Sequence, residues 1–113
     1  MEYLDFKLGS RGGARWRGKL DGRAYILDVL WLSGPEVWSL TIYDGKETLL
    51  RAGLWLRHGE DILEAFTSPD LPGGGVGKLR VWDTANQQRD PGRDDLRRGS
   101  GVRLIYIPAA EVA

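Results

Sequence analysis

The chain has 113 residues, of which 42% are hydrophobic and 28% charged, and its 16 basic and 16 acidic residues give a formal net charge of zero. This size and composition are typical of one ordinary globular domain. The balanced charge excludes a strongly basic protein drawn to nucleic acid or anionic lipid by its overall field. The chain has no cysteine, which excludes disulfides and thiolate metal sites and fits folding in a reducing compartment.

The N-terminal segment, MEYLDFKLGS, contains acidic residues and lacks the apolar core of a secretory signal. No run of residues approaches the roughly 18 apolar positions that a membrane span requires. We therefore expect neither an ordinary signal peptide nor a membrane-spanning segment. We expect a single β domain over residues 1–113, with residues 1–14 as a candidate mobile N-terminal segment.

The sequence predicts a first β-hairpin over residues 15–32. Two alternating segments, Arg15–Leu20 and Ala24–Leu32, flank an Asp21-Gly22 pair. This pair is a strong hairpin signal, because both central positions of a tight primed turn need positive φ. Both faces of the second segment are largely apolar, so we expect it to be a central strand covered on two sides.

A second hairpin is predicted directly after the first. The strand Val37–Tyr43 leads into Asp44-Gly45, which repeats the turn chemistry, and Thr48–Leu56 returns. Alternation within the returning strand predicts an inward-facing set. Its members are Leu50, Ala52, Leu54 and Leu56.

The second half of the chain contains shorter segments. We predict strands at Asp61–Phe66, Lys78–Asp83 and Val102–Ile107, with a glycine-rich loop at 71–75 and a long polar loop at 84–101. A connection as long as the second loop is uncommon in a compact domain unless it binds something or moves. The predicted fold is all-β, a small single-domain antiparallel β-barrel or sandwich of six to seven strands.

Some segments of the chain resemble catalytic or ligand-binding motifs, but each lacks residues that the chemistry of the motif requires. Gly77-Lys78 follows glycines as in a phosphate-binding loop, but Pro72 and Leu79 stand where that loop needs glycine and serine or threonine. His58 is the sole histidine and has no second histidine or cysteine as a fellow metal ligand.

Asp94 and Asp95 are the remaining candidates for acid chemistry. The arginines around them would lower the pKa of each carboxyl group, the opposite of what a general acid requires. These are Arg89, Arg93, Arg97 and Arg98. Two interpretations of this segment remain open. It is either a solvated loop whose charges pair with one another, or an interaction loop that becomes ordered on docking. We therefore predict no catalytic, cofactor-binding or metal-binding residues, and a protein that is not an enzyme.

Basic residues alternate with tryptophan in Arg15-Trp16-Arg17 and Arg80-Val81-Trp82. Such a pattern suits a platform for single-stranded nucleic acid, on which bases stack while cations neutralise phosphates. The zero net charge and the isoelectric point near 6.6 weigh against it. A single-strand-binding β-barrel module therefore remains the alternative function, and a small hydrolase without a readable motif is the third class.

The order of the segments resembles the small baseplate plug family of contractile-tailed phages. The points of similarity are residues 20–25 (LDGRAY), 37–44 (VWSLTIYD), 52–56 (AGLWL), 71–74 (LPGG), 77–83 (GKLRVWD), 94–96 (DDL) and 102–106 (VRLIY). They span roughly residues 15–107. The chain departs from the pattern in its arginine- and glycine-rich segment 9–18 and in the loop Arg89–Arg98.

This resemblance implies a compact β-barrel-like virion component at the distal end of the tail tube, a plug-like module without cofactors. It implies baseplate hub and tail-tube proteins as partners, a place in the virion tail, and the host cytoplasm as the site of assembly. The uneven distribution of charge, basic early and acidic in the middle, suits a homo-oligomer, although scattered surface charge also explains it.

Aromatic rings beside arginine are enriched at protein interfaces, so we expect the contacts of such a module to use them. The predicted contact residues are Trp16, Trp55, Trp82, Arg97 and Arg98. The predicted core residues are Trp38, Leu40, Ile42, Leu54, Val81 and Leu104. Trp31 fits either role.

Overall fold

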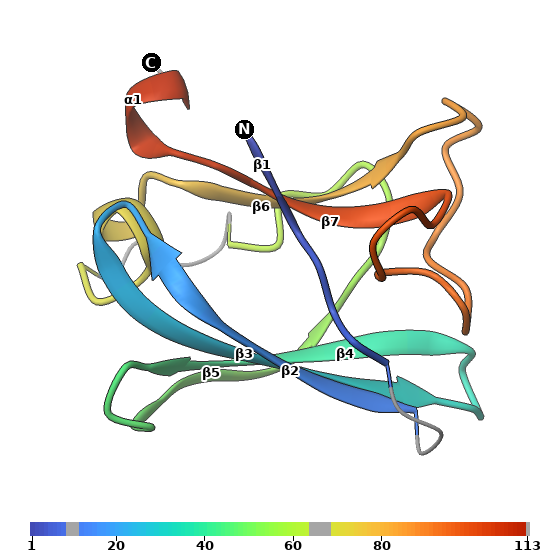
Figure 1. Ribbon diagram of the computed structural model, residues 1–113, viewed down its shortest axis with the longest axis horizontal. Coiled ribbons are helices and arrows are strands. Elements are labelled where there is room, and N and C mark those ends of the chain that lie inside the picture. Colours follow the sequence, from blue (N-terminus) through green and yellow to red (C-terminus); the bar gives the residue numbers. More distant parts are fainter. Residues whose placement is uncertain (9–11, 64–68, 113) are drawn as a thin grey trace.

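The computed structural model describes residues 1–8, 12–63 and 69–112. Within them, seven strands form two antiparallel sheets (Figure 1). The three-stranded sheet, in the order β1-β7-β6, contains β1 (Glu2–Leu4), β6 (Lys78–Asp83) and β7 (Val102–Ile107). The four-stranded sheet, in the order β2-β3-β4-β5, contains β2 (Gly13–Leu20), β3 (Arg23–Leu32), β4 (Val37–Asp44) and β5 (Leu49–Trp55).

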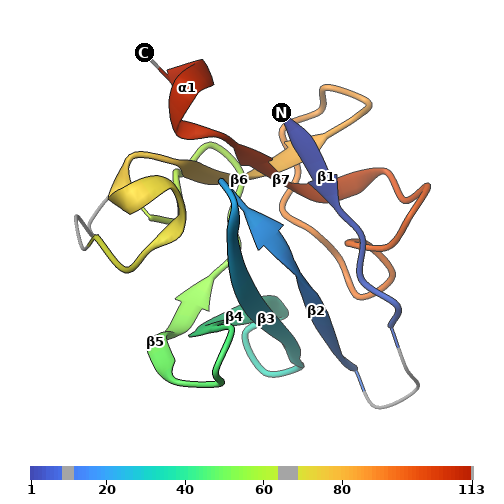
Figure 2. The same cartoon turned by 60° about the vertical axis from the view of Figure 1, so that its left-hand side comes forward.

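The two sheets lie face to face as a sandwich, which confirms the predicted all-β class (Figures 1 and 2). On one side of the sandwich the chain after β5 crosses to β6, where His58 bridges Val81 and Asp61 bridges Arg80. On the other side β1 lies in one layer and β2 in the other (Figure 2). The described helical segments are short, the 3-10 turn Pro72–Gly75 and α1 (Ala109–Val112). In the described part of the chain no helix has the length and apolar character of a membrane span.

The first hairpin has the predicted turn. Asp21 and Gly22 have φ of 52° and 78°, so both central positions are left-handed, as a primed turn requires. β3 is a central strand between β2 and β4, also as predicted. The prediction that both its faces are covered is wrong at one position, because Leu30 is 53% exposed on the outer face.

The second hairpin differs from its prediction. β4 ends at Asp44 and β5 begins at Leu49, and the left-handed residue of the connection is Glu47, with φ of 64°. The Asp44 carboxylate accepts hydrogen bonds from the N–H groups of Lys46 and Thr48, both 2.9 Å long. The connection is therefore a longer loop closed by an aspartate side chain.

β5 is irregular, and its irregularity overturns one inward-facing assignment. Leu40 pairs with Leu54 but Ile42 pairs with Arg51, so β5 has an extra residue in this interval. Gly53, in the same interval, has φ of 70°. Because a bulge breaks the alternation of side chains, Ala52 is exposed instead of buried.

The N-terminal segment, expected to be mobile, supplies the edge strand β1, and Leu4 and Phe6 are buried in the core. The strand predicted at Asp61–Phe66 is reduced in its described part to the single bridge at Asp61, followed by a turn. The rest of that prediction lies outside the described residues.

The core fills the space between the two sheets. Of its predicted members, five are buried, namely Trp38, Leu40, Ile42, Val81 and Leu104, and Leu54 is partly buried. Trp31 is half-buried and packs edge-to-face on Trp38, with 5.5 Å between ring centroids. These two rings therefore pack together at the end of the sandwich where β3 ends and β4 begins.

Candidate interaction surface

The five predicted contact residues occupy different environments. Trp55 and Trp82 are 43% and 47% exposed, and Arg97 and Arg98 are exposed on the long loop 84–101. Trp16 is half-buried and packs against the core from β2. The structure thus places four of the five residues on or beside loop 84–101 and sets Trp16 apart.

Trp55 is connected to loop 84–101 through its neighbours. The guanidinium of Arg57 lies 5.2 Å from the Trp55 ring centroid, within the range of a cation–π contact. The same guanidinium lies 3.3 Å from the carboxylate of Asp90, which also accepts a 2.7 Å hydrogen bond from the His58 N–H. His58 therefore holds the loop through its backbone.

Asp83, the last residue of β6, organises the start of the loop. Its buried carboxylate accepts hydrogen bonds from the N–H groups of Ala85 (2.9 Å), Gln87 (3.2 Å) and Arg89 (3.3 Å), and from the Arg89 guanidinium (3.2 Å). Burial opposes ionisation, but the hydrogen bonds from Arg89 and Ala85 outweigh it, so the pKa of Asp83 lies below its ordinary value. Sequence reasoning missed this residue, although an aspartate at a strand end before a polar run is a signal for turns of this kind.

The far half of the loop is fixed by Asp95, Leu96 and Trp38. The Asp95 carboxylate accepts hydrogen bonds from the N–H groups of Gly92 (2.7 Å) and Val102 (3.1 Å), while Asp94 is exposed. Leu96 is fully buried, and the Trp38 indole N–H donates to the Gly92 carbonyl at 2.7 Å. The aspartate pair is therefore divided between a structural turn and solvent, and the loop closes one end of the sandwich (Figure 1).

A second aromatic surface covers the outer face of the three-stranded sheet. Trp82 pairs with Arg103 across the ladder, and the Arg103 guanidinium lies 3.8 Å from the ring centroid of Tyr3, which is 39% exposed. Asp5 forms an ion pair with the same guanidinium. The sequence pointed to Trp82 but not to Tyr3 or Arg103, because the strand β1 that brings Tyr3 there was not predicted.

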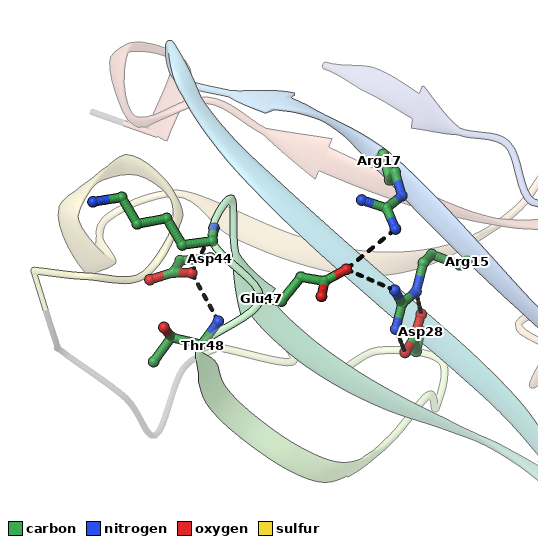
Figure 3. A network of polar contacts seen from close by, with 7 residues as sticks. Arg15, Arg17, Asp28, Asp44, Glu47 and Thr48 are labelled. Carbon is green, nitrogen blue, oxygen red and sulfur yellow. Dashed lines mark hydrogen bonds and ion pairs between the residues drawn. The ribbon is translucent and has the colours of Figure 1, made fainter.

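A network of ion pairs occupies the outer face of the four-stranded sheet (Figure 3). Arg15 forms two hydrogen bonds of 2.7 and 2.8 Å with the Asp28 carboxylate, and Glu47 lies 3.3 Å from both Arg15 and Arg17. The hydrogen bond to Asp28 raises the pKa of Arg15 above its ordinary value. Basic residues of the early segment thus pair with acidic residues of the middle segment within one chain, which accounts for part of the uneven charge distribution.

The same geometry bears on the nucleic-acid alternative. Arg15 and Arg17 alternate with Trp16 along β2, so the tryptophan faces the core while the two arginines face outward. The ring is therefore on the opposite side of the sheet from the cations. A stacking platform needs both on one surface, so β2 does not provide one, whereas Arg80 and Trp82, two residues apart on β6, share one face of their sheet.

Two hollows lie on either side of Arg23, with volumes of about 590 Å³ and 420 Å³. In the smaller one, Arg23 donates a hydrogen bond to the Pro69 carbonyl (2.7 Å), and in the larger one the Tyr25 hydroxyl donates to the Asp70 carbonyl (2.9 Å). These side chains therefore hold Pro69 and Asp70, just before the 3-10 turn. In the described ranges, no group of three or more histidine, cysteine, aspartate or glutamate side chains is arranged to hold a metal ion.

The fold and its outer faces define a small β-sandwich that presents aromatic and arginine side chains around an ordered loop, an arrangement typical of an interaction module. A family model described as "Cyanophage baseplate Pam3 plug gp18" matches residues 14–109. Because this match covers most of the chain, the protein belongs to this family of phage baseplate plug proteins. No curated protein matches the chain.

Proposed function

We propose that this protein is a structural component of a contractile phage tail baseplate, a plug-like module at the hub and tube end that acts through protein contacts and catalyses no reaction. The observation that carries the proposal is the family match over residues 14–109, which includes all of β3 to β7 and nearly all of β2. A match of this extent covers every described strand except β1 and the first residue of β2.

The surfaces are consistent with such a role. Tryptophan contributes a large contact area with few rotatable bonds, and arginine adds a charged group with several hydrogen-bond donors. Here Trp55 is on β5 and Trp82 is on β6. We propose Trp55, Trp82, Arg97 and Arg98 as residues that contact baseplate neighbours, with Trp16 in the separate role described below. Loop 84–101 presents Arg97 and Arg98 from an already ordered backbone, so their docking orders little additional chain.

The proposed partners are the baseplate hub and tail-tube proteins, with assembly in the host cytoplasm and residence in the virion tail. If several copies surround the tail axis, each contact needs only modest affinity, because the binding of one assembly strengthens when many contacts form at once. The charge pairs between Arg15, Asp28 and Glu47 are made within one chain. They therefore provide no specific argument for a homo-oligomer.

The test is incorporation of variants into tails. Trp82→Ala and Trp55→Ala are exposed changes that should leave the unfolding temperature close to that of the wild type. We expect both to lower the amount of this protein in purified tail particles by about tenfold or more, as interface tryptophans do. Leu49→Ala is the matched control, because Leu49 is 57% exposed and not a proposed contact residue. Normal incorporation of a variant that combines Trp55→Ala and Trp82→Ala would overturn the proposed contact surface. Tails that assemble and infect normally without the protein would overturn the proposed function.

A further inference from the structure

Four strands form the edges of the two sheets, and in the described structure three of them are protected against pairing with another strand. β1 has three residues, and β6 is bridged along its outer side by His58 and Asp61. β5 departs from regular pairing at two points and contains Gly53 with positive φ. By contrast, β2 pairs with β3 over eight residues without a register shift.

The register shows which backbone groups of β2 point away from β3. Leu20 and Arg23 flank the two-residue turn and therefore form a hydrogen-bonded pair, after which such pairs alternate along the ladder. The 2.7 Å bond from the Trp31 N–H to the Gly12 carbonyl continues this alternation. The residues whose N–H and C=O groups point away from β3 are Gly13, Arg15, Arg17 and Lys19, which we call the outer edge of β2. Within the described chain, no hydrogen bond is made to the main-chain groups of this edge.

We propose that the outer edge of β2 accepts an extended strand of another tail protein, one that carries acidic side chains at alternate positions, so that the four-stranded sheet gains a further strand. This inference rests on the proposed function for the nature of the partner. Main-chain hydrogen bonds provide affinity in such strand addition, and alternate side chains provide specificity.

The charge of β2 argues for an acidic partner and against a second copy. β2 contains Arg15, Arg17 and Lys19 and no acidic residue, and all three cations lie on its outer face. Side chains directly opposite each other in an antiparallel pair lie about 5 Å apart, and like charges there are unfavourable. Two copies of β2 side by side would place these cations against one another, whereas carboxylates at alternate positions would neutralise them.

The local ion pairs leave part of this charge unmatched. Asp28 pairs with Arg15, and Glu47 is shared between Arg15 and Arg17. Lys19 makes no ion pair with any of the described residues. The positive charge on β2 therefore exceeds the negative charge of the carboxylates that pair with it.

Trp16 fits the same proposal from the inner face. Its indole lies over Gly18, where an added Cβ would come within 2.6 Å of the ring. The Trp16 side chain therefore lies along β2 and does not extend across to the three-stranded sheet. It is half-buried, and an added strand would cover part of the exposed ring. A contact role for Trp16 thus follows from its position on the edge strand.

The experiment uses proline, which removes a backbone donor only where it is placed. Arg17→Pro removes a donor from the outer edge and leaves the ladder to β3 intact, while Arg17→Ala removes the same charge and keeps the donor. The probe is a synthetic peptide of about eight residues in which glutamate alternates with valine or threonine. A second peptide has lysine in place of every glutamate.

Amide NMR spectra and hydrogen exchange of the full chain report the binding site. We expect the acidic peptide to protect the amides of Arg15, Arg17 and Lys19, and the lysine peptide to leave them unchanged. Arg17→Pro should weaken binding of the acidic peptide by about tenfold or more relative to Arg17→Ala. Equal binding by the two variants, equal binding of the two peptides, or protection elsewhere overturns the inference, as does a concentration-dependent dimer that protects the same amides. Exchange in the wild type keeps the test decisive if Arg17→Pro does not fold.

Incorporation into tails separates this inference from the proposed function. Arg17→Pro protein that enters tails as well as Arg17→Ala protein overturns the edge inference and leaves the plug function standing. Tails that neither contain nor require the wild-type chain contradict the function itself, whatever the peptide result.

Discussion

The hydroxyl group of Tyr106 donates a hydrogen bond to the carboxylate of Asp21 and so joins the two sheets of the sandwich. Tyr106 is on β7, and Asp21 is the first residue of the turn between β2 and β3. The Ala109 N–H donates to the same carboxylate oxygen at 3.1 Å. One aspartate side chain thus holds the β2–β3 turn, β7 and the start of α1 together.

Removing this hydroxyl should destabilise the fold without altering its surface. We expect Tyr106→Phe to lower the free energy of unfolding by about 1–3 kcal/mol, because the buried Tyr106 side chain loses its hydrogen bond to a carboxylate. Denaturant unfolding measures the change. Tyr3→Phe is the matched control, since Tyr3 is partly exposed and keeps its ring beneath Arg103. Equal stability of the two variants would show that the bond between the sheets contributes nothing.

The same bond predicts a loss of stability at alkaline pH. Burial, together with the Asp21 carboxylate, raises the pKa of Tyr106 above its ordinary value of 10.0. Above pH 10 the unfolded chain releases the phenolic proton while the folded chain retains it, so the free energy of unfolding falls as pH rises. We expect Tyr106→Phe to flatten this fall in urea titrations between pH 9 and about 11. An unchanged slope would contradict the assignment.

Glycine at position 77 is required by the same tyrosine. A Cβ atom there would overlap the Tyr106 hydroxyl, and one at Gly73 would lie 2.8 Å from the Asp21 carboxylate. We expect Gly77→Ala to lower the free energy of unfolding by about 1–3 kcal/mol or more through overpacking. Gly34→Ala serves as the control, because a Cβ there meets no atom within 4 Å. If thermal denaturation shows equal losses for both, the packing explanation of the glycine-rich segment is wrong.

Asp83 should make the fold sensitive to acid. Its pKa lies below the ordinary 3.8, so its contribution is complete above that pH and is lost as pH falls through the lower pKa of the folded state. Asp83→Asn should unfold at a lower denaturant concentration at pH 7 and lose less further stability on acidification than the wild type. Asp94→Asn, an exposed change in the same loop, should behave as the wild type. Parallel acid titrations of the three proteins decide the matter.

The local elements that the sequence predicts well are those with strong short-range chemistry. The Asp21-Gly22 turn, the central place of β3 and the burial of Trp38 follow from turn residues and alternation. Prediction fails where a side chain closes a loop or where a bulge interrupts the alternation of a strand. The Asp44 side chain closes a longer loop whose sequence resembles a two-residue turn. The bulge at Gly53 leaves Ala52 exposed, although alternation predicted that it faces inward.

The parts of the candidate surface that were not predicted depend on long-range pairing. β1 is three residues long and pairs with β7 at the other end of the chain, so no local sequence pattern predicts that Tyr3 lies beside Arg103. Loop 84–101 reads as polar and unstructured, yet its order comes from Asp83, Asp95 and Leu96, whose partners become apparent only when the sheets are assembled. Alternation and turn residues predict the fold class, and the contacts between distant segments decide the surface.

Cryo-electron microscopy of purified tails is the most direct test of the central claim, that this sandwich works as a fixed structural part of the baseplate. We expect density for the two sheets and loop 84–101 at the distal end of the tube, in contact with hub or tube subunits. Complete tails in which no density at the baseplate accommodates the sandwich would contradict it.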